Sequence, residues 1–173
     1  MLLTIGKQTA DRELGLLREL LEILDGKLSE IKQQIELSAN PDSAGLCDKG
    51  EYLIGIGFVA MQQYMTEALL FQGISKNDAL NLGPVHSSGA TYASLINSAA
   101  NWWKHEPEWV NVGKIPANGT RTFDHIANVA PESGYELSNV LASLCSNEEL
   151  SLSAVVAFLV AWRDTLINQD TRK

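Results

Sequence analysis

Hydrophobic residues recur at alternating spacings of three and four between Asp11 and Leu37. This is the heptad spacing of an amphipathic helix with one apolar seam. Leu16, Leu20 and Ile23 widen the stripe in its first half, as expected where a helix packs on a globular core as well as on a second helix. The pattern predicts packing within the chain or self-association through the seam. The seam residues are Leu14, Leu17, Leu21, Leu24, Leu28, Ile31 and Ile35.

A polar interruption separates this helix from a second one. The stretch SANPDSAGLCDKG contains Pro, Gly and several Asn, Asp and Ser residues, which predicts a linker over about residues 38–47. A second helix is predicted from near Asp48 to Phe71. Because no charged residue occurs between Tyr52 and Thr66, we expect this helix to be buried on more than one face and to lie at the centre of the fold.

Helix start signals continue through the rest of the chain. The stretch SKND, residues 75–78, has the form of a capping box before a short helix that GP ends at residues 83–84. Longer helices are predicted over about residues 88–105, 122–130, 134–145 and 147–168. The last two follow further capping boxes, Ser133 with Glu136 and Ser146 with Glu149.

These elements predict an all-α fold, a helical bundle with a long N-terminal amphipathic helix. Only WVNVGKI, residues 109–115, is a plausible extended stretch. The expected organisation is a helix or arm over residues 1–37, a linker over 38–47 and a helical domain over 48–173. At 173 residues with 45% hydrophobic content, the chain can bury the core of one such domain.

Charge limits the partners to be expected. A formal net charge of -8 repels phosphate backbones, so DNA binding is not expected, although a local site could bind RNA. The longest charge-free apolar segments are too short or too interrupted to span a membrane.

Cysteine and histidine spacing predicts neither a metal nor another cofactor. Cys47 and Cys145 are far apart, which gives no zinc pattern or disulfide framework and favours a reducing cytoplasm. The start of the chain lacks the basic and apolar regions of a secretory signal. His86, His105 and His125 have no ligand-like spacing with Asp, Glu or Cys.

The predicted helix that ends near His105 has two faces. One face is apolar and aromatic, and the other carries Asn97, Asn101 and His105 at steps of four residues. No charged residue occurs between Asp78 and Lys104, so the polar face is expected to meet another helix, a ligand or a second copy rather than bulk water.

Pro107 favours a helix end near His105. A histidine at a helix C-terminus is suited to exchanging protons near neutral pH. Capping or packing is the alternative role for this side chain.

The stretch AANWWKHEPEW resembles motifs of the HEPN superfamily of helical proteins. Asn101-x-x-x-His105 is similar to the second half of its R-N-x-x-x-H signature. The stretch also resembles the N-Y-W-K-H-x-x-E-W sequence of related uncharacterised bacterial proteins. Active HEPN members are metal-independent ribonucleases that work as dimers, which implies His105 as acid/base and Asn101 as its orienting group. Lys104 is a nearby cation, but its ammonium cannot reproduce the fork of a guanidinium. The signature arginine, however, is replaced by Ala100.

Three functions follow as hypotheses. The first is a protein-interaction or regulatory subunit of bacterial or phage origin, catalytically inactive, in defence or toxin-antitoxin systems, with a protein partner or a second copy. The second is a metal-independent endoribonuclease that uses His105. The third is a small-molecule binder between the two charge-free helices. The candidate binding residues are Asn97, Trp102, Trp103, Glu106 and Trp109.

Overall fold

Seven α-helices and a two-stranded hairpin make up the part of the chain that a computed structural model describes, residues 2–5, 8–70, 72–111, 115–131, 134–146 and 149–170. The predicted all-α bundle with a long N-terminal helix is confirmed. The elements are β1 (Leu2–Ile5), β2 (Gln8–Asp11), α1 (Arg12–Leu37), α2 (Leu46–Leu69), α3 (Lys76–Leu80), α4 (Tyr92–Asn111), α5 (Ala117–Ala127), α6 (Glu136–Leu144) and α7 (Leu152–Asp170).

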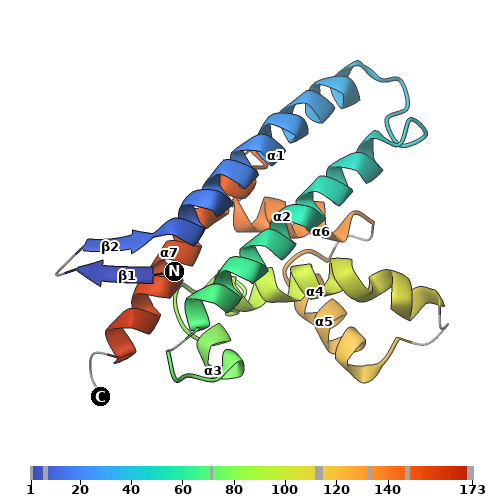
Figure 1. Cartoon of the computed structure of the whole chain (residues 1–173). Coiled ribbons are helices and arrows are strands. Elements are labelled where there is room, and N and C mark those ends of the chain that lie inside the picture. Colours follow the sequence, from blue (N-terminus) through green and yellow to red (C-terminus); the bar gives the residue numbers. More distant parts are fainter. Residues whose placement is uncertain are drawn as a thin grey trace.

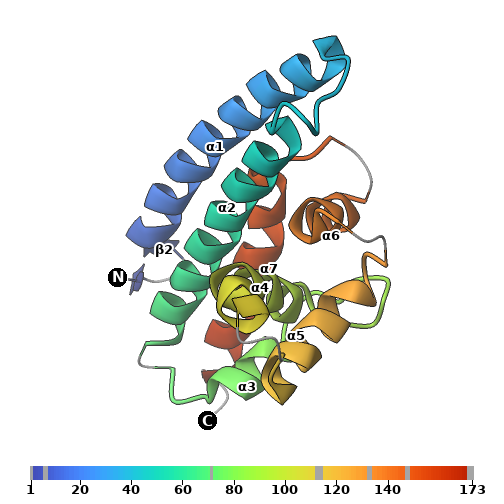
Figure 2. The same ribbon diagram turned by 90° about the vertical axis from the view of Figure 1, so that its right-hand side faces the viewer.

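Helix α2 lies at the centre of the bundle, as its charge-free sequence predicts. It packs against α1, α4, α6 and α7. Figure 1 shows α1 and α2 as a long antiparallel pair with α7 behind them. In Figure 2, α4, α5 and α6 lie on the side of α2 away from α1. None of the helices in the described ranges is long and apolar enough to cross a membrane.

The heptad seam of α1 packs within the chain. Leu14, Leu17, Leu21 and Leu24 are buried in the hydrophobic core, where α1 contacts α2 and α7. The later seam residues are only half-buried, because the second half of α1 extends beside α2 away from the rest of the bundle (Figure 1). The interpretation of the seam as intramolecular packing is confirmed.

The wider stripe on α1 does not cover the core. Leu16, Leu20 and Ile23 are 49%, 38% and 64% exposed. Their expected role against the globular core is therefore wrong, because the side chains of the seam, and not these three, are buried where α1 packs on α2 and α7. An exposed apolar edge remains on α1.

Side chains from other helices cap the helices whose starts were predicted least well. Ser75 caps α3 as predicted, since its Oγ accepts a hydrogen bond from the N–H of Asp78 at 3.1 Å. Ser146 does not cap the last helix, which begins only at Leu152. There Asp25 of α1 accepts hydrogen bonds from the N–H groups of Leu152 and Ser153 at 2.7 and 3.0 Å. Ser151 Oγ, directly before the helix, accepts a hydrogen bond from the N–H of Ala154 at 3.2 Å. A local serine and a carboxylate distant in sequence thus cap the start of α7 together.

A second distant carboxylate accepts hydrogen bonds at the start of α6. Glu51 of α2 accepts hydrogen bonds from the N–H groups of Leu137 and Ser138 at 2.6 and 2.9 Å. The predicted partner, Ser133, lies outside the described residues. The helix expected over 122–130 begins earlier, at Ala117, directly after Pro116 with φ of -69°.

The N-terminal hairpin is the one sheet in the described part of the chain, and the pattern of hydrophobic residues did not predict it. Strand β1 pairs antiparallel with β2, with Leu2 opposite Asp11. Each strand has only four residues, and β2, QTAD, has no apolar alternation. The hairpin leads directly into α1, whose N-cap is Asp11.

Asp11 joins three parts of the fold through buried hydrogen bonds. Its carboxylate accepts from the N–H of Leu14 at 3.0 Å, from Tyr64 Oη at 2.7 Å and from Arg163 Nη1 at 2.9 Å. Burial by itself raises the pKa of Asp11. The hydrogen bonds and the positive charge of Arg163 outweigh burial and hold this pKa below its ordinary value. The hairpin, α2 and α7 are therefore tied together by one ion pair with a tyrosine partner.

Candidate functional site

Helix α4 carries the candidate residues and is longer than the sequence predicts. It begins at Tyr92 rather than near residue 88, because Thr91 Oγ1 accepts the N–H of Ser94 at 3.1 Å and caps it there. It continues through Pro107 to Asn111, so the predicted end near His105 is wrong. The expected extended stretch is also wrong for residues 109–111, and residues 112–114 lie outside the described part.

Packing of Trp109 accounts for the helix beyond Pro107. A proline lacks the N–H that would bond the carbonyl four residues earlier, which weakens a helix. Trp109 nevertheless lies on the same face as Trp102, with ring centroids 5.8 Å apart. It also lies so close to Gly119 of α5 that a Cβ there would be 3.0 Å from the indole. These contacts hold the last turn of α4 against α5.

Gln62 of α2 joins three of the polar residues predicted on α4. Its side chain is 7% exposed, and Nε2 donates to Oδ1 of Asn97 at 2.8 Å and Oδ1 of Asn101 at 2.9 Å. Its Oε1 accepts from Lys104 Nζ at 2.6 Å. Because an ammonium can only donate, the glutamine oxygen must face Lys104 and the amide nitrogen then faces the asparagines. We call these four residues the Gln62 network.

The Gln62 network gives the uncharged polar face of α4 a structural role. The expectation that this face meets another element is confirmed for Asn97 and Asn101, which meet α2. A buried amide without partners costs about 1 to 3 kcal/mol, so each of these hydrogen bonds favours the close contact of α2 with α4. The signal in the sequence was Gln62 itself, a polar residue inside the charge-free stretch from Tyr52 to Thr66.

Lys104 bonds to the Gln62 network and not to a carboxylate. Burial lowers the pKa of Lys104, and the positive charge of Lys76 lowers it further. In the described part of the chain, Lys104 takes part in no ion pair. Its ammonium donates to Gln62, which places it on the α2 side of α4.

His105 lies apart from the Gln62 network. Its side chain is 44% exposed, Nδ1 lies 3.3 Å from Glu108 Oε2, and the ring stacks on Trp109 with centroids 5.7 Å apart. Asn101 is bonded to Gln62, and no hydrogen bond joins it to His105 in the described structure. Among the described residues, no hydrogen bond therefore joins the acid/base group to the orienting group that the HEPN resemblance implies.

Ala100 occupies the position where the HEPN resemblance implies an arginine. It is 0% exposed and belongs to the hydrophobic core with Ala99. An arginine at this position would have to place its charge in the core or displace α4, and burying an unpaired charge is costly. An alanine at position 100 thus fits the packing of α4, and an arginine does not.

The tryptophans attach α4 to its neighbours on two sides. Trp102 packs on Phe123 of α5, with ring centroids 5.1 Å apart. Trp103 meets the edge of Tyr52 of α2 at 5.5 Å and lies over Gly55, which has no side chain to exclude it. Both rings are half-buried, so each also keeps part of its surface accessible.

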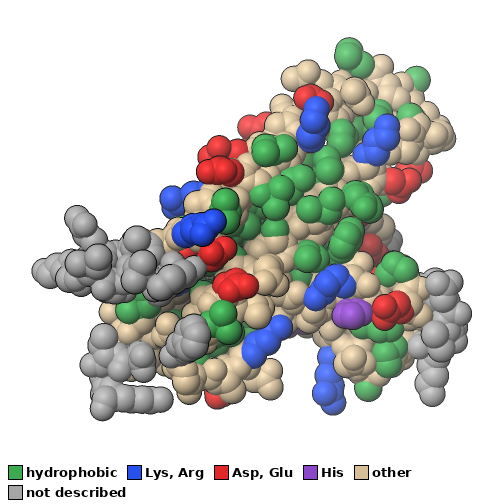
Figure 3. Space-filling model, in the orientation of Figure 1, with side chains coloured by type: hydrophobic (Ala, Val, Ile, Leu, Met, Phe, Trp, Pro, Cys, Tyr) green, Lys and Arg blue, Asp and Glu red, His purple; other side chains and the backbone are tan. Residues whose placement is uncertain are grey.

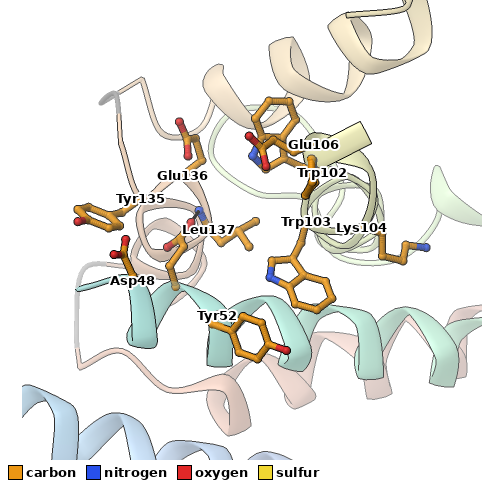
Figure 4. A pocket seen from close by; sticks show the side chains of 11 residues that line it. Asp48, Tyr52, Trp102, Trp103, Lys104, Glu106, Tyr135, Glu136 and Leu137 are labelled. Carbon is orange, nitrogen blue, oxygen red and sulfur yellow. Dashed lines mark hydrogen bonds between the residues drawn. The ribbon is translucent and has the colours of Figure 1, made fainter. Parts of the chain in front are cut away.

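A cavity of about 660 Å³ lies between α2, α4 and the start of α6, and we call it the α2–α4–α6 cavity (Figure 4). Among the candidate residues, Trp102, Trp103, Lys104 and Glu106 line it, whereas His105 does not. Sequence analysis missed the rest of the wall because it comes from distant segments. These residues are Asp48, Glu51 and Tyr52 of α2, Pro107 of α4, and Tyr135, Glu136 and Leu137 at the start of α6.

The other two histidines bond to serines. His86 Nδ1 lies 3.0 Å from Ser88 Oγ, and His125 Nε2 lies 3.1 Å from Ser94 Oγ. Burial lowers the pKa of His125. Within the described ranges, no three His, Cys, Asp or Glu side chains gather as metal ligands.

No family model, curated protein or solved structure matches this chain. The function has to be argued from the arrangement of its own side chains.

Proposed function

We propose that this chain is a helical protein-interaction or regulatory subunit that does not cleave RNA. The observation that carries the proposal is an exposed apolar band on the α1–α2 pair. A setting in bacterial or phage defence, or in a toxin-antitoxin system, is suggested by the HEPN resemblance alone. A cytoplasmic location fits Cys47 and Cys145, which are not joined in a disulfide.

The apolar band consists of Leu16, Leu20 and Ile23 of α1 and Tyr52 of α2, each at least 38% exposed. Figure 3 shows hydrophobic side chains gathered over the α1–α2 face. Lys27 of α1, one turn after Ile23, and Tyr52 of α2 line the same shallow hollow. The exposed side chains of the two helices therefore lie on the same face of the molecule. Exposed apolar side chains gathered on one face are typical of protein contact sites. The partner would be another protein or a second copy of the chain.

The alternative function, a metal-independent ribonuclease, is favoured by one observation, the accessible ring of His105. Such an enzyme needs a proton acceptor, a proton donor and a cation near the scissile phosphate. Asn101 and Lys104 are already bonded to Gln62, and Ala100 is buried. These contacts support an inactive protein over the enzyme.

Purified protein is expected to leave RNA intact. End-labelled mixed RNA would be incubated in chelating buffer with the wild type and with His105→Ala, and cleavage followed on sequencing gels. We expect both proteins to give the same background rate, because Lys104 already donates to Gln62 and the residue before Asn101 is the buried Ala100 rather than a cation that could stabilise the transition-state charge.

His86→Ala is the matched control for that assay, since the ring of His86 lies against serines and the side chain of Tyr92, away from α4's candidate residues. Cleavage by the wild type that persists in His86→Ala and vanishes in His105→Ala would overturn the proposal in favour of the enzyme.

A further inference from the structure

We propose that the α2–α4–α6 cavity binds an organic cation, namely the ammonium or guanidinium group of a lysine or arginine side chain presented by a partner protein. The inference rests on the proposed function, for which it supplies a recognition site. Three features carry it: the aromatic walls of the cavity, three lining carboxylates that bond to no other described residue, and its continuity with the apolar band.

Aromatic rings form much of the wall. Tyr52, Trp102, Trp103 and Tyr135 all line the cavity, and Tyr52 is 59% exposed. A volume of about 660 Å³ falls within the range of pockets that take a small organic group. Aromatic faces attract cations through their quadrupole, and the weakly hydrated guanidinium group also stacks on them.

Carboxylates give the cavity its charge preference. Asp48, Glu106 and Glu136 line it and form no hydrogen bond or ion pair with other described residues. A fourth carboxylate, Glu51, is already bonded to the first turn of α6. Figure 4 shows Asp48 and Glu136 on one side of the cavity, and Tyr52 and Trp103 on another. A cation between them would face unpaired negative charge and aromatic rings together.

Lys104 does not neutralise these carboxylates. Its ammonium donates to Gln62 at 2.6 Å. In Figure 4 its side chain extends away from Asp48 and Glu136. Anionic ligands are therefore disfavoured in the cavity. A bare metal ion is disfavoured too, because the described residues offer no group of three ligands close enough to hold one.

Continuity with the apolar band indicates where the cation comes from. Tyr52 belongs both to the band and to the cavity wall. A protein that covers the band therefore reaches the mouth of the cavity, and one of its long basic side chains can enter while its backbone stays on the surface.

The test uses the full chain and short peptides, followed by NMR of the indole N–H signals. Acetyl-Gly-Arg-Gly-amide is expected to shift the signals of Trp102 and Trp103. It should leave Trp162 unchanged, because this indole is buried and donates to the carbonyl of Ala79 at 2.8 Å. The same peptide with uncharged citrulline should cause no shift. Tetramethylammonium, a free cation, should bind no more tightly than the arginine peptide.

Isosteric variants test the role of charge. Glu106→Gln and Asp48→Asn are each expected to raise the peptide Kd about threefold, as for loss of one partly exposed charge contact. Glu108→Gln is the matched control, since Glu108 lies on the same helix, is exposed and does not line the cavity. An unchanged Trp162 signal will show that each variant is folded.

Several results would overturn the inference. They are no shift with the arginine peptide, an equal shift with the citrulline peptide, equal effects of Glu106→Gln and Glu108→Gln, or tighter binding of tetramethylammonium. Failure here is distinguishable from failure of the proposed function. Ribonuclease activity that depends on His105 would refute the proposed function, and cation binding could still be measured. A protein that neither cleaves RNA nor binds the cation would refute only the proposed cation site.

Discussion

Replacing Arg163 by alanine is expected to lower the free energy of unfolding by about 3 to 5 kcal/mol, the range for breaking a buried ion pair from one side. The Arg163 and Asp11 side chains are only 10% and 7% exposed, and their charged atoms lie 2.9 Å apart. Without the guanidinium, Asp11 keeps Tyr64 and the N–H of Leu14 as its hydrogen-bond partners among the described residues. Urea denaturation at neutral pH measures the loss.

The control is Lys27→Ala, which breaks an exposed pair with Glu30 whose side chains are 58% and 60% exposed. Its expected cost is below about 1 kcal/mol, as for surface ion pairs. The double variant Asp11→Asn with Arg163→Met should recover most of the stability, because asparagine still caps α1 and no unpaired charge stays buried. Equal costs for Arg163→Ala and Lys27→Ala would contradict this account of the ion pair.

The same ion pair gives a pH dependence with a definite sign. The folded-state pKa of Asp11 lies below its ordinary value of 3.8, so its contribution is fully present above that pH. It is lost as the pH falls through the lowered folded-state pKa. The destabilisation of the wild type on acidification should therefore be smaller in Arg163→Ala, which lacks the charge that lowers this pKa.

Gly55→Ala is expected to destabilise the protein by about 1 to 3 kcal/mol through overpacking, although alanine is the better helix former. A Cβ at Gly55 would lie 2.0 Å from Trp103 Cδ1, so the indole would have to leave its place. Its edge contact with Tyr52 would be lost as well. The gain in helix propensity, about 1 kcal/mol, is too small to compensate. Urea midpoints and tryptophan fluorescence measure both effects.

Gly26→Ala is the matched control for that substitution. Gly26 lies inside α1, and an added Cβ there meets nothing within 4 Å. Only the higher helix propensity of alanine then affects stability, so this variant should be more stable than the wild type by up to about 1 kcal/mol. If Gly55→Ala were stabilised like Gly26→Ala, the close contact of α2 with Trp103 would be refuted.

The periodicity of hydrophobic residues predicted the fold correctly where one face of a helix is buried in the core. Leu14, Leu17, Leu21 and Leu24 were expected on one seam and are buried together. It failed where a distant carboxylate helps to cap a helix. Asp25 of α1 bonds the start of α7 beside the local cap Ser151, and Glu51 of α2 bonds the start of α6. No local pattern reveals either carboxylate. The hairpin was missed because four-residue strands leave too few positions to show alternation.

The candidate site was predicted in part. The polar face of α4 was expected to meet another element, and Asn97 and Asn101 do so through Gln62. The helix end at Pro107 was wrong, because tertiary packing of Trp109 overrides a local preference. The α2–α4–α6 cavity could not be predicted, since Asp48 and Glu136 approach only when α2 and α6 pack against α4.

The central claim is that Asn101 belongs to the Gln62 network and not to a catalytic pair with His105. Two double-mutant cycles, measured by urea denaturation, test it directly. Gln62→Ala combined with Asn101→Ala should show a coupling energy of about 1 to 2 kcal/mol, whereas His105→Ala combined with Asn101→Ala should be additive within about 0.5 kcal/mol. The reverse outcome, additivity for the first pair and coupling for the second, would contradict the account.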